Sequence, residues 1–233
     1  MMGMLALSSR ITVMAQVYTV HPESPQRRVI DQIRDALQGG AVMLYPTDTV
    51  YAIGCDLNSK SAVEKVRKIK QLANDKPLTF LCSSLSDIAK YAQVSDPSYR
   101  LMRRLVPGPV TFILPATKLV PKIVQNPKRK TTGIRVPDHA VAQALLDALG
   151  NPIISTSATV GVSSEDEYIP VVSTSTAELF DAFDKLVDLI VDNGQDQSHD
   201  VSTVLDLCED PIKVLRQGQG WDEMESLLEG AIA

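Results

Sequence analysis

The stretch YPTDTVYAIG at residues 45–54 decides how the first half of the chain folds. Pro46 has no N–H for a sheet ladder, and the carboxylate of Asp48 needs a partner or water, so the apolar strand predicted over 41–45 ends here. Two interpretations fit the polar residues. They form either a strand end that opens into a cleft for a small polar ligand, or a turn in which Thr47 and Asp48 satisfy local backbone groups.

Helices and strands alternate outward from this stretch, which predicts an α/β fold. Strands are expected at 16–20, 41–45, 78–82, 110–114, 131–136, 153–154, 187–191, 201–207 and 212–215. Helices are expected from Ser24-Pro25 to Gly39-Gly40 and at 61–72, 84–91, 96–105, 138–149, 174–186 and 221–228, with a polar surface loop at 162–168. A capping box formed by Ser61 and Glu64 is predicted to start the second helix.

Length and composition favour one domain in a reducing compartment. The chain has 233 residues, is 44% hydrophobic and contains three widely spaced cysteines, which fits neither a disulfide framework nor a zinc site. No apolar run approaches the roughly 18 residues that span a membrane, so a cytoplasmic protein is expected. Residues 1–15 are predicted to be a disordered leader, with Met14 a candidate initiator, followed by a domain at 16–220 and a terminal helical segment at 221–233.

Charge is distributed unevenly along the chain. Residues 60–135 hold 16 Lys and Arg against 4 Asp and Glu, whereas residues 136–233 hold 3 against 19. Such an excess indicates an anionic ligand, either nucleotide phosphates or an RNA backbone. The alternative is a solvated helical surface.

Two cations stand out by position. Lys70 lies within the apolar arc of the helix at 61–72, whereas Arg67 and Lys68 lie outside it. The Lys70 ammonium either extends along the surface to solvent or points into a cleft toward an anion. Arg135 ends an apolar strand, where its planar fork suits a carboxylate ligand or one of the protein's own acids.

Hydroxyl groups gather where further strands end. STSATVG at 155–161 follows an apolar strand and can offer hydroxyls and N–H groups to phosphate or ribose. Ser202 and Arg216 belong to two later segments of the same kind. The chain has no GxxxxGK[ST], GxGxxG, HExxH or GxSxG motif, and its three histidines are isolated in the sequence. Any ATP is therefore bound in another way.

Taken in order, these segments resemble the YrdC/YciO family over about residues 16–218, and KRKTTGIRVPDH at 128–139 is similar to its YciO branch. The markers are YPTDTVYAIG at 45–54, KQL at 70–72, PGPVTFIL at 107–114, GIRVP at 133–137, STSATVG at 155–161, STVLD at 202–206 and LRQG at 215–218. The resemblance implies a single-domain twisted mixed β-sheet flanked by helices, with a concave, positively charged cavity.

The resemblance also implies an activity and its site. Catalytic members are threonylcarbamoyl-AMP synthases, which join L-threonine, bicarbonate and ATP, release pyrophosphate and serve tRNA modification. Lys70 and Arg135 would be catalytic by positioning and charge neutralisation, and Mg²⁺ would arrive with ATP without a protein ligand cluster. The substrate side would comprise Thr47, Thr49, Tyr51, Arg135 and Ser202; the nucleotide side, for ATP or AMP, would comprise Lys70, Ser155, Ser157, Thr159 and Arg216. Candidate phosphate or RNA contacts are Arg67, Lys68, Lys128, Arg129 and Lys130.

Two positions depart from the catalytic pattern. Leu72 stands where the family motif K-x-R has its arginine, and Thr159 stands where S-x-N has its asparagine. Two hypotheses follow: an altered threonylcarbamoyl-AMP synthase, or a nucleotide-binding or double-stranded RNA-binding relative that has lost or changed the reaction.

The basic segment at 60–135 generates a first testable prediction. Double-stranded RNA should bind weakly, and its affinity should fall steeply as salt rises, because binding releases condensed counterions. Filter binding across a salt series measures this slope. Salt-independent binding, or no binding in dilute buffer, would contradict RNA binding and indicate that the segment binds only small anions.

Overall fold

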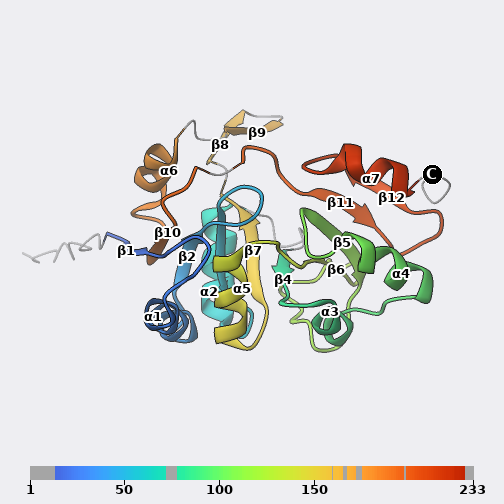
Figure 1. Ribbon diagram of the computed structural model, residues 1–233, viewed down its shortest axis with the longest axis horizontal. Coiled ribbons are helices and arrows are strands. Elements are labelled where there is room, and N and C mark those ends of the chain that lie inside the picture. Colours follow the sequence, from blue (N-terminus) through green and yellow to red (C-terminus); the bar gives the residue numbers. More distant parts are fainter. Residues whose placement is uncertain are drawn as a thin grey trace, which may run out of the picture.

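One twisted, mixed sheet organises the protein in this computed structural model (Figure 1). The structure describes residues 14–71, 78–158, 160–164, 167–171, 175–196 and 198–228. Across the sheet the ten strands are β1 (Gln16–Thr19), β10 (Leu189–Asp192), β2 (Val42–Tyr45), β3 (Ala52–Asp56), β7 (Ile153–Ser157), β4 (Thr79–Leu81), β6 (Thr131–Arg135), β5 (Val110–Pro115), β11 (Thr203–Asp206) and β12 (Lys213–Arg216).

Parallel and antiparallel pairs mix in this sheet. The pairs β1 with β10, β10 with β2, β4 with β6 and β5 with β11 are parallel. The pairs β2 with β3, β3 with β7, β7 with β4, β6 with β5 and β11 with β12 are antiparallel. A separate antiparallel hairpin is formed by β8 (Val160–Ser164) and β9 (Glu167–Val171).

Helices pack against the sheet through two apolar clusters. They are α1 (Arg27–Gln38), α2 (Lys60–Ile69), α3 (Leu85–Tyr91), α4 (Asp96–Leu105), α5 (Ala140–Leu149), α6 (Thr176–Phe183) and α7 (Trp221–Leu228). One cluster joins α1 and α5 to side chains of β10, β2, β3 and β7, such as Met43 and Ile153. The other joins α2, α3, α4, α6 and α7 to side chains of the opposite alternation, such as Phe80, Phe112 and Ile134. The predicted α/β fold with a single sheet flanked by helices is confirmed.

Most predicted elements lie where the sequence placed them, and the differences have local causes. The first helix begins at Arg27, because the N–H groups of Glu23 and Ser24 donate to His21 Nδ1 in a turn that precedes it. The cap of α2 is Ser59, whose Oγ accepts the Ala62 N–H at 3.4 Å, so the predicted capping box at Ser61 is wrong.

Two strand assignments also differ. The strand β3 was missed because Gly54 breaks its apolar pattern. A Cβ at Gly54 would lie 2.7 Å from the Tyr45 ring and 2.8 Å from the Ile154 carbonyl oxygen, so only glycine lets the neighbouring chains approach this closely. The predicted loop at 162–168 is wrong, because backbone hydrogen bonds pair β8 with β9 despite a polar sequence.

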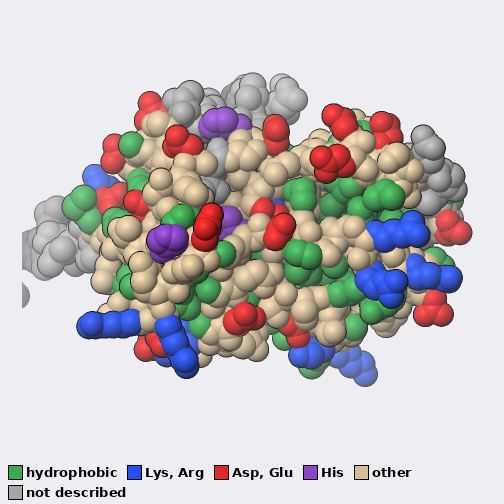
Figure 2. Space-filling view, in the orientation of Figure 1, with side chains coloured by type: hydrophobic (Ala, Val, Ile, Leu, Met, Phe, Trp, Pro, Cys, Tyr) green, Lys and Arg blue, Asp and Glu red, His purple; other side chains and the backbone are tan. Residues whose placement is uncertain are grey.

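The charge asymmetry of the sequence is partly visible on the surface. Acidic side chains gather over α6 and α7, and basic side chains gather over the end of the molecule that carries α4 (Figure 2). In the part of the chain that the structure describes, no helix has the length and apolar character needed to cross a bilayer. The predicted leader at 1–15 lies almost wholly outside the described residues, which begin at Met14.

The packing of α5 makes a stability prediction. Leu145 is fully buried, so Leu145→Ala should lower the free energy of unfolding by about 2–5 kcal/mol through lost apolar burial and a residual cavity. The control is Asp147→Ala on the exposed side of the same helix, expected within about 0.5 kcal/mol of wild type. Urea denaturation measures both, and equal midpoints for the two variants would contradict the packing.

Candidate functional site

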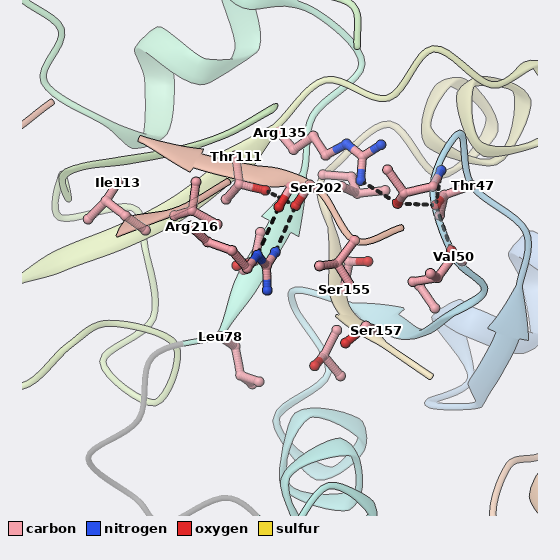
Figure 3. Close-up of a pocket in the computed structure, with 17 residues that line it drawn as sticks. Thr47, Val50, Leu78, Thr111, Ile113, Arg135, Ser155, Ser157, Ser202 and Arg216 are labelled. Atoms are coloured by element: carbon pink, nitrogen blue, oxygen red, sulfur yellow. Dashed lines mark hydrogen bonds between the residues drawn. The ribbon is translucent and has the colours of Figure 1, made fainter. Parts of the chain in front are cut away.

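A cavity of about 350 Å³ lies against the sheet, a volume within the usual range for ligand sites (Figure 3). It is lined by Thr47, Thr49, Val50, Ala52, Leu78, Thr79, Leu81, Thr111, Ile113, Arg135, Ser155, Thr156, Ser157, Val201, Ser202, Val204 and Arg216. The lining is rich in hydroxyl groups and contains two arginines and no acidic residue.

The alternation of strand side chains explains this lining. In β4, Phe80 enters the core cluster shared with α2 to α4, whereas Thr79 and Leu81 face the cavity. In β5, Phe112 enters the same cluster and Thr111 faces the cavity. Small hydroxyl side chains thus occupy the surface where the other half of the sheet carries packing residues.

Gly133 in β6 leaves room for the cavity because it has no side chain. A Cβ at Gly133 would lie 2.7 Å from Thr79 Oγ1 and 3.4 Å from Thr111 Cγ2, and both of those residues line the cavity. A side chain at position 133 would therefore displace cavity-lining groups.

Side chains of the loop after β2 hydrogen-bond to the loop's own backbone, and the same loop lines the cavity. The turn and the ligand cleft, which were alternatives in the sequence, are therefore both present. Thr47 Oγ1 donates to the Val50 carbonyl at 2.7 Å, and the Thr49 N–H donates to Thr47 Oγ1 at 3.2 Å. The two threonine hydroxyl oxygens are 3.1 Å apart. Because the Thr47 proton is used on Val50, the Thr49 hydroxyl donates to Thr47, whose oxygen then accepts two hydrogen bonds. The Thr49 oxygen accepts one hydrogen bond, from Arg135, and keeps one lone pair for a ligand.

Arg135 is buried and fully anchored at the edge of the cavity. Its Nε donates to the Gly108 carbonyl at 3.1 Å, its Nη1 donates to Thr49 Oγ1 at 2.8 Å, and its Nη2 lies 2.5 Å from Asp48 Oδ1. Both alternatives left open for this arginine are therefore present: it pairs with one of the protein's own acids, and it lines the cavity. Because Nε and Nη2 are engaged, the two-pronged grip on a ligand carboxylate predicted from the sequence is not available in this arrangement.

Arg216 approaches the cavity from the end of β12. Its Nε donates to the Ser202 carbonyl at 2.9 Å and its Nη2 to Ser202 Oγ at 3.1 Å, while Ser202 Oγ and Thr111 Oγ1 are 3.0 Å apart (Figure 3). Burial and the positive charge of Arg135 lower the pKa of Arg216. Two guanidinium groups thus share one cavity, and the charge of Arg216 raises its affinity for anions.

Ser155 is held by the core tyrosine of β2. Tyr45 donates its hydroxyl to Ser155 Oγ at 2.8 Å, and burial raises the pKa of Tyr45, which keeps this phenol protonated as the donor. Ser155 can then direct its own proton toward a ligand.

Seven of the predicted site residues line the cavity: Thr47, Thr49, Arg135, Ser155, Ser157, Ser202 and Arg216. Thr79, Thr111 and Thr156 line it as well and were not predicted. A hydroxyl residue alternating with core residues in TFL and VTFIL was the available signal for the first two.

Three predicted site residues are not placed in the cavity. Tyr51 is 3% exposed, packs edge-on against Phe180 and donates its hydroxyl to Asn193 Oδ1 at 3.4 Å, so its predicted contact with substrate stays a prediction. Lys70 caps the end of α2 half-buried and is absent from the cavity lining, so its predicted role in catalysis and nucleotide binding stays a prediction. Thr159 lies outside the described residues.

The predicted basic contacts divide into two groups. Arg67 is 5% exposed and donates Nε to the Ile123 carbonyl at 3.2 Å, so its predicted exposure to phosphate or RNA is wrong; the segment around Ile123 packs over this side of α2. Arg129 pairs with Asp206 at 2.8 Å, and this hydrogen bond raises the pKa of Arg129. The exposed Lys68, Lys128 and Lys130 stay candidate contacts for phosphate or RNA.

The described residues contain no group of three or more His, Cys, Asp or Glu side chains arranged to hold a metal ion. The donors at the cavity are instead hydroxyls and guanidinium groups. This chemistry suits an anionic ligand with polar substituents.

The comparisons with known proteins agree with this fold and cavity. The Sua5–YciO–YrdC family model, described as "Telomere recombination", matches residues 35–218. The protein YciO of Escherichia coli K12, described as uncharacterized, is 41% identical over 207 residues, which cover 89% of this chain and 97% of YciO. Its crystal structure superposes with a TM-score of 0.79.

Two further relatives carry a named activity or ligand. The mouse threonylcarbamoyl-AMP synthase is 32% identical over 200 residues, covering 83% of this chain and 68% of the mouse protein. The crystal structure of P. abyssi Sua5 complexed with L-threonine is 27% identical with a TM-score of 0.80, covering 93% of this chain and 62% of Sua5.

The family model spans residues 35–218, and the E. coli relative matches 89% of this chain. The chain belongs to the Sua5–YciO–YrdC family.

Proposed function

We propose that the cavity binds L-threonine and ATP and that the protein is a threonylcarbamoyl-AMP synthase acting in tRNA threonylcarbamoyl-adenosine modification. The reaction joins L-threonine, bicarbonate and ATP and releases pyrophosphate. The observation that carries the proposal is a hydroxyl-lined cavity that holds the guanidinium groups of Arg135 and Arg216. The activity named for the mouse relative and the threonine bound to Sua5 support the choice of substrates.

The cavity offers a distinct chemistry at each of its arginines. Thr49 presents one acceptor lone pair beside Arg135 Nη1, which suits an amino acid that carries both an ammonium and a carboxylate. Arg216, with Ser202 and Thr111, presents N–H and O–H donors, which suit phosphate oxygens. Nucleotide phosphates and threonine therefore meet between the two groups.

In the proposed reaction, the amine of threonine attacks bicarbonate: a C–N bond forms, a C–O bond of bicarbonate breaks, and water leaves. The resulting carbamate attacks the α-phosphorus of ATP. A carbamate oxygen–phosphorus bond forms, and the bond from the α-phosphorus to the bridging oxygen breaks, so that pyrophosphate leaves with the electron pair. The protein supplies positioning and charge neutralisation and no covalent nucleophile. We propose that Mg²⁺ enters bound to ATP, because the cavity lining offers no carboxylate and Mg²⁺ is commonly held by substrate phosphates and water.

A second candidate function is a nucleotide-binding or double-stranded RNA-binding relative with a lost or altered reaction. The observation that favours it is the pair Leu72 and Thr159, which replace an arginine and an asparagine of the catalytic motifs. A missing guanidinium beside a triphosphate would lower the rate by roughly two to three powers of ten. In this second function, the exposed Lys128 and Lys130 would contact the phosphate backbone of RNA.

Pyrophosphate release separates the two candidates. We expect the purified protein to release pyrophosphate from ATP only when L-threonine and bicarbonate are both present, because the carboxylated amino acid is the attacking group. A coupled phosphate assay with each substrate omitted in turn measures this dependence. ATP binding without threonine-dependent release would reject the synthase and favour the binding relative.

The sequence departure at position 72 gives a direct test of catalytic competence. Leu72→Arg restores the K-x-R spacing with Lys70. It should raise threonine-dependent turnover if the wild type lacks a cation needed to hold the phosphates of ATP. Leu72→Lys is the matched control, because it adds the same charge without a bidentate fork. A thermally stable Leu72→Arg variant with no gain, beside a fully active wild type, would show that the arginine is not required.

A further inference from the structure

The ion pair between Asp48 and Arg135 is nearly closed to solvent. The side chains are 11% and 6% exposed, and Asp48 Oδ1 lies 2.5 Å from Arg135 Nη2. Asp48 itself is not part of the cavity lining, although its neighbours Thr47 and Thr49 are. The loop therefore places two hydroxyls in front of the guanidinium and one carboxylate behind it.

The Asp48 carboxylate interacts with its surroundings through charge. Neither of its oxygens accepts a hydrogen bond from the residues that the structure describes, and its backbone carbonyl is held by Gln219 Nε2 at 2.9 Å. A buried carboxylate without hydrogen-bond donors is stable only beside a compensating charge, which here is Arg135. The converse also holds: the positive charge of Arg135 is cancelled at the point where it meets the cavity.

Further titratable groups near Arg135 in the described part of the chain include Arg216, which shares the cavity, and His139. His139 faces the pair from the start of α5, where its Nδ1 accepts the Ala142 N–H at 3.4 Å. Burial lowers the pKa of His139, so the ring is neutral at pH 7. Asp138 is the other acid near His139 and lies on the exposed side of the chain.

Arg216 lacks such a counter-charge. Among the described residues, no carboxylate lies within ion-pair distance of its guanidinium, whose partners are the Ser202 carbonyl and hydroxyl. The full positive charge of Arg216 therefore reaches the cavity. Its hydroxyl neighbours Ser202 and Thr111 share one hydrogen bond, which leaves one of their two protons for a ligand.

We propose that Asp48 is a specificity-determining counter-ion that divides the cavity into two subsites of different charge. The Arg135 subsite is electrically neutral, offers one N–H donor and one acceptor oxygen, that of Thr49, and takes the amino acid. The Arg216 subsite is cationic, offers only donors, and takes phosphate. Asp48 cancels the charge of Arg135, and a multiply charged pyrophosphate would need that charge to bind tightly, so Asp48 excludes phosphate from the amino-acid subsite.

This inference rests on the proposed function, because it assumes that the cavity takes both an amino acid and phosphates. It goes further in stating that the charge of Asp48 prevents phosphate from binding at Arg135. It also explains why a buried acid follows Thr47 directly: the loop requires a negative charge at this position and hydroxyls on either side.

The test replaces the charge and counts bound pyrophosphate by isothermal titration calorimetry. Wild type should bind one inorganic pyrophosphate per chain, and L-threonine should not compete with it. Asp48→Asn should bind two, the second in competition with L-threonine, because Gly108 and Thr49 still hold Arg135 in place. Asp48→Glu, which keeps the charge, should return to one.

Asp206→Asn is the matched control. It removes a buried acid, 4% exposed, from its pair with Arg129, and neither residue lines the cavity. Pyrophosphate stoichiometry should stay at one. A folded Asp48→Asn variant that still binds a single pyrophosphate without competition from L-threonine would overturn the inference.

A second variant decides the matter if Asp48→Asn does not fold. Arg216→Gln in an otherwise wild-type chain should weaken pyrophosphate binding at least tenfold, since it removes charge-assisted hydrogen bonds, while L-threonine affinity stays within about twofold. Unchanged pyrophosphate binding would overturn the division. A wild type that binds neither L-threonine nor pyrophosphate would instead contradict the proposed function itself.

Discussion

The guanidinium of Arg135 joins segments that lie far apart in the sequence, and the cavity depends on this junction. Its anchors are the Gly108 carbonyl before β5, Thr49 Oγ1 and Asp48 after β2, and its own strand β6. Gln219 extends the junction to the C-terminal part of the chain through the Asp48 carbonyl. Because one planar group satisfies partners on several elements, loss of any partner would leave a buried charge or donor uncompensated.

The same strands build the core and the site, because side chains alternate between the two faces of the sheet. Phe80, Phe112 and Ile134 are fully buried on one face, and their neighbours Thr79 and Thr111 line the cavity on the other. The site is thereby mounted on hydrogen-bonded strands whose positions the core fixes. Ligand groups placed on such a rigid surface lose little free energy to reorganisation when a substrate binds.

The sequence predicted the architecture well because the fold depends on periodic apolar patterns that survive local irregularity. It placed most strand ends within one or two residues, and seven of the predicted polar residues meet at one cavity; the strand predicted at 153–154 continues to Ser157 as β7. It failed where a tertiary neighbour decides the outcome. The exposed position predicted for Arg67 ignored the Ile123 carbonyl, and the β3 strand was hidden by Gly54, which is required by the close approach of Tyr45. The sequence likewise did not reveal the partner of Arg135, because Asp48 is distant in the sequence and becomes its neighbour only in the folded protein.

The pairing of β11 with β5 has a consequence for the order in which the molecule becomes functional. Ser202 and Arg216 belong to the last part of the chain, yet they complete a cavity whose other walls come from residues 47 to 157. During synthesis on the ribosome, the sheet as far as β7 can form while the cationic wall is still inside the exit tunnel. The cavity is therefore complete only after β11 and β12 have joined the sheet.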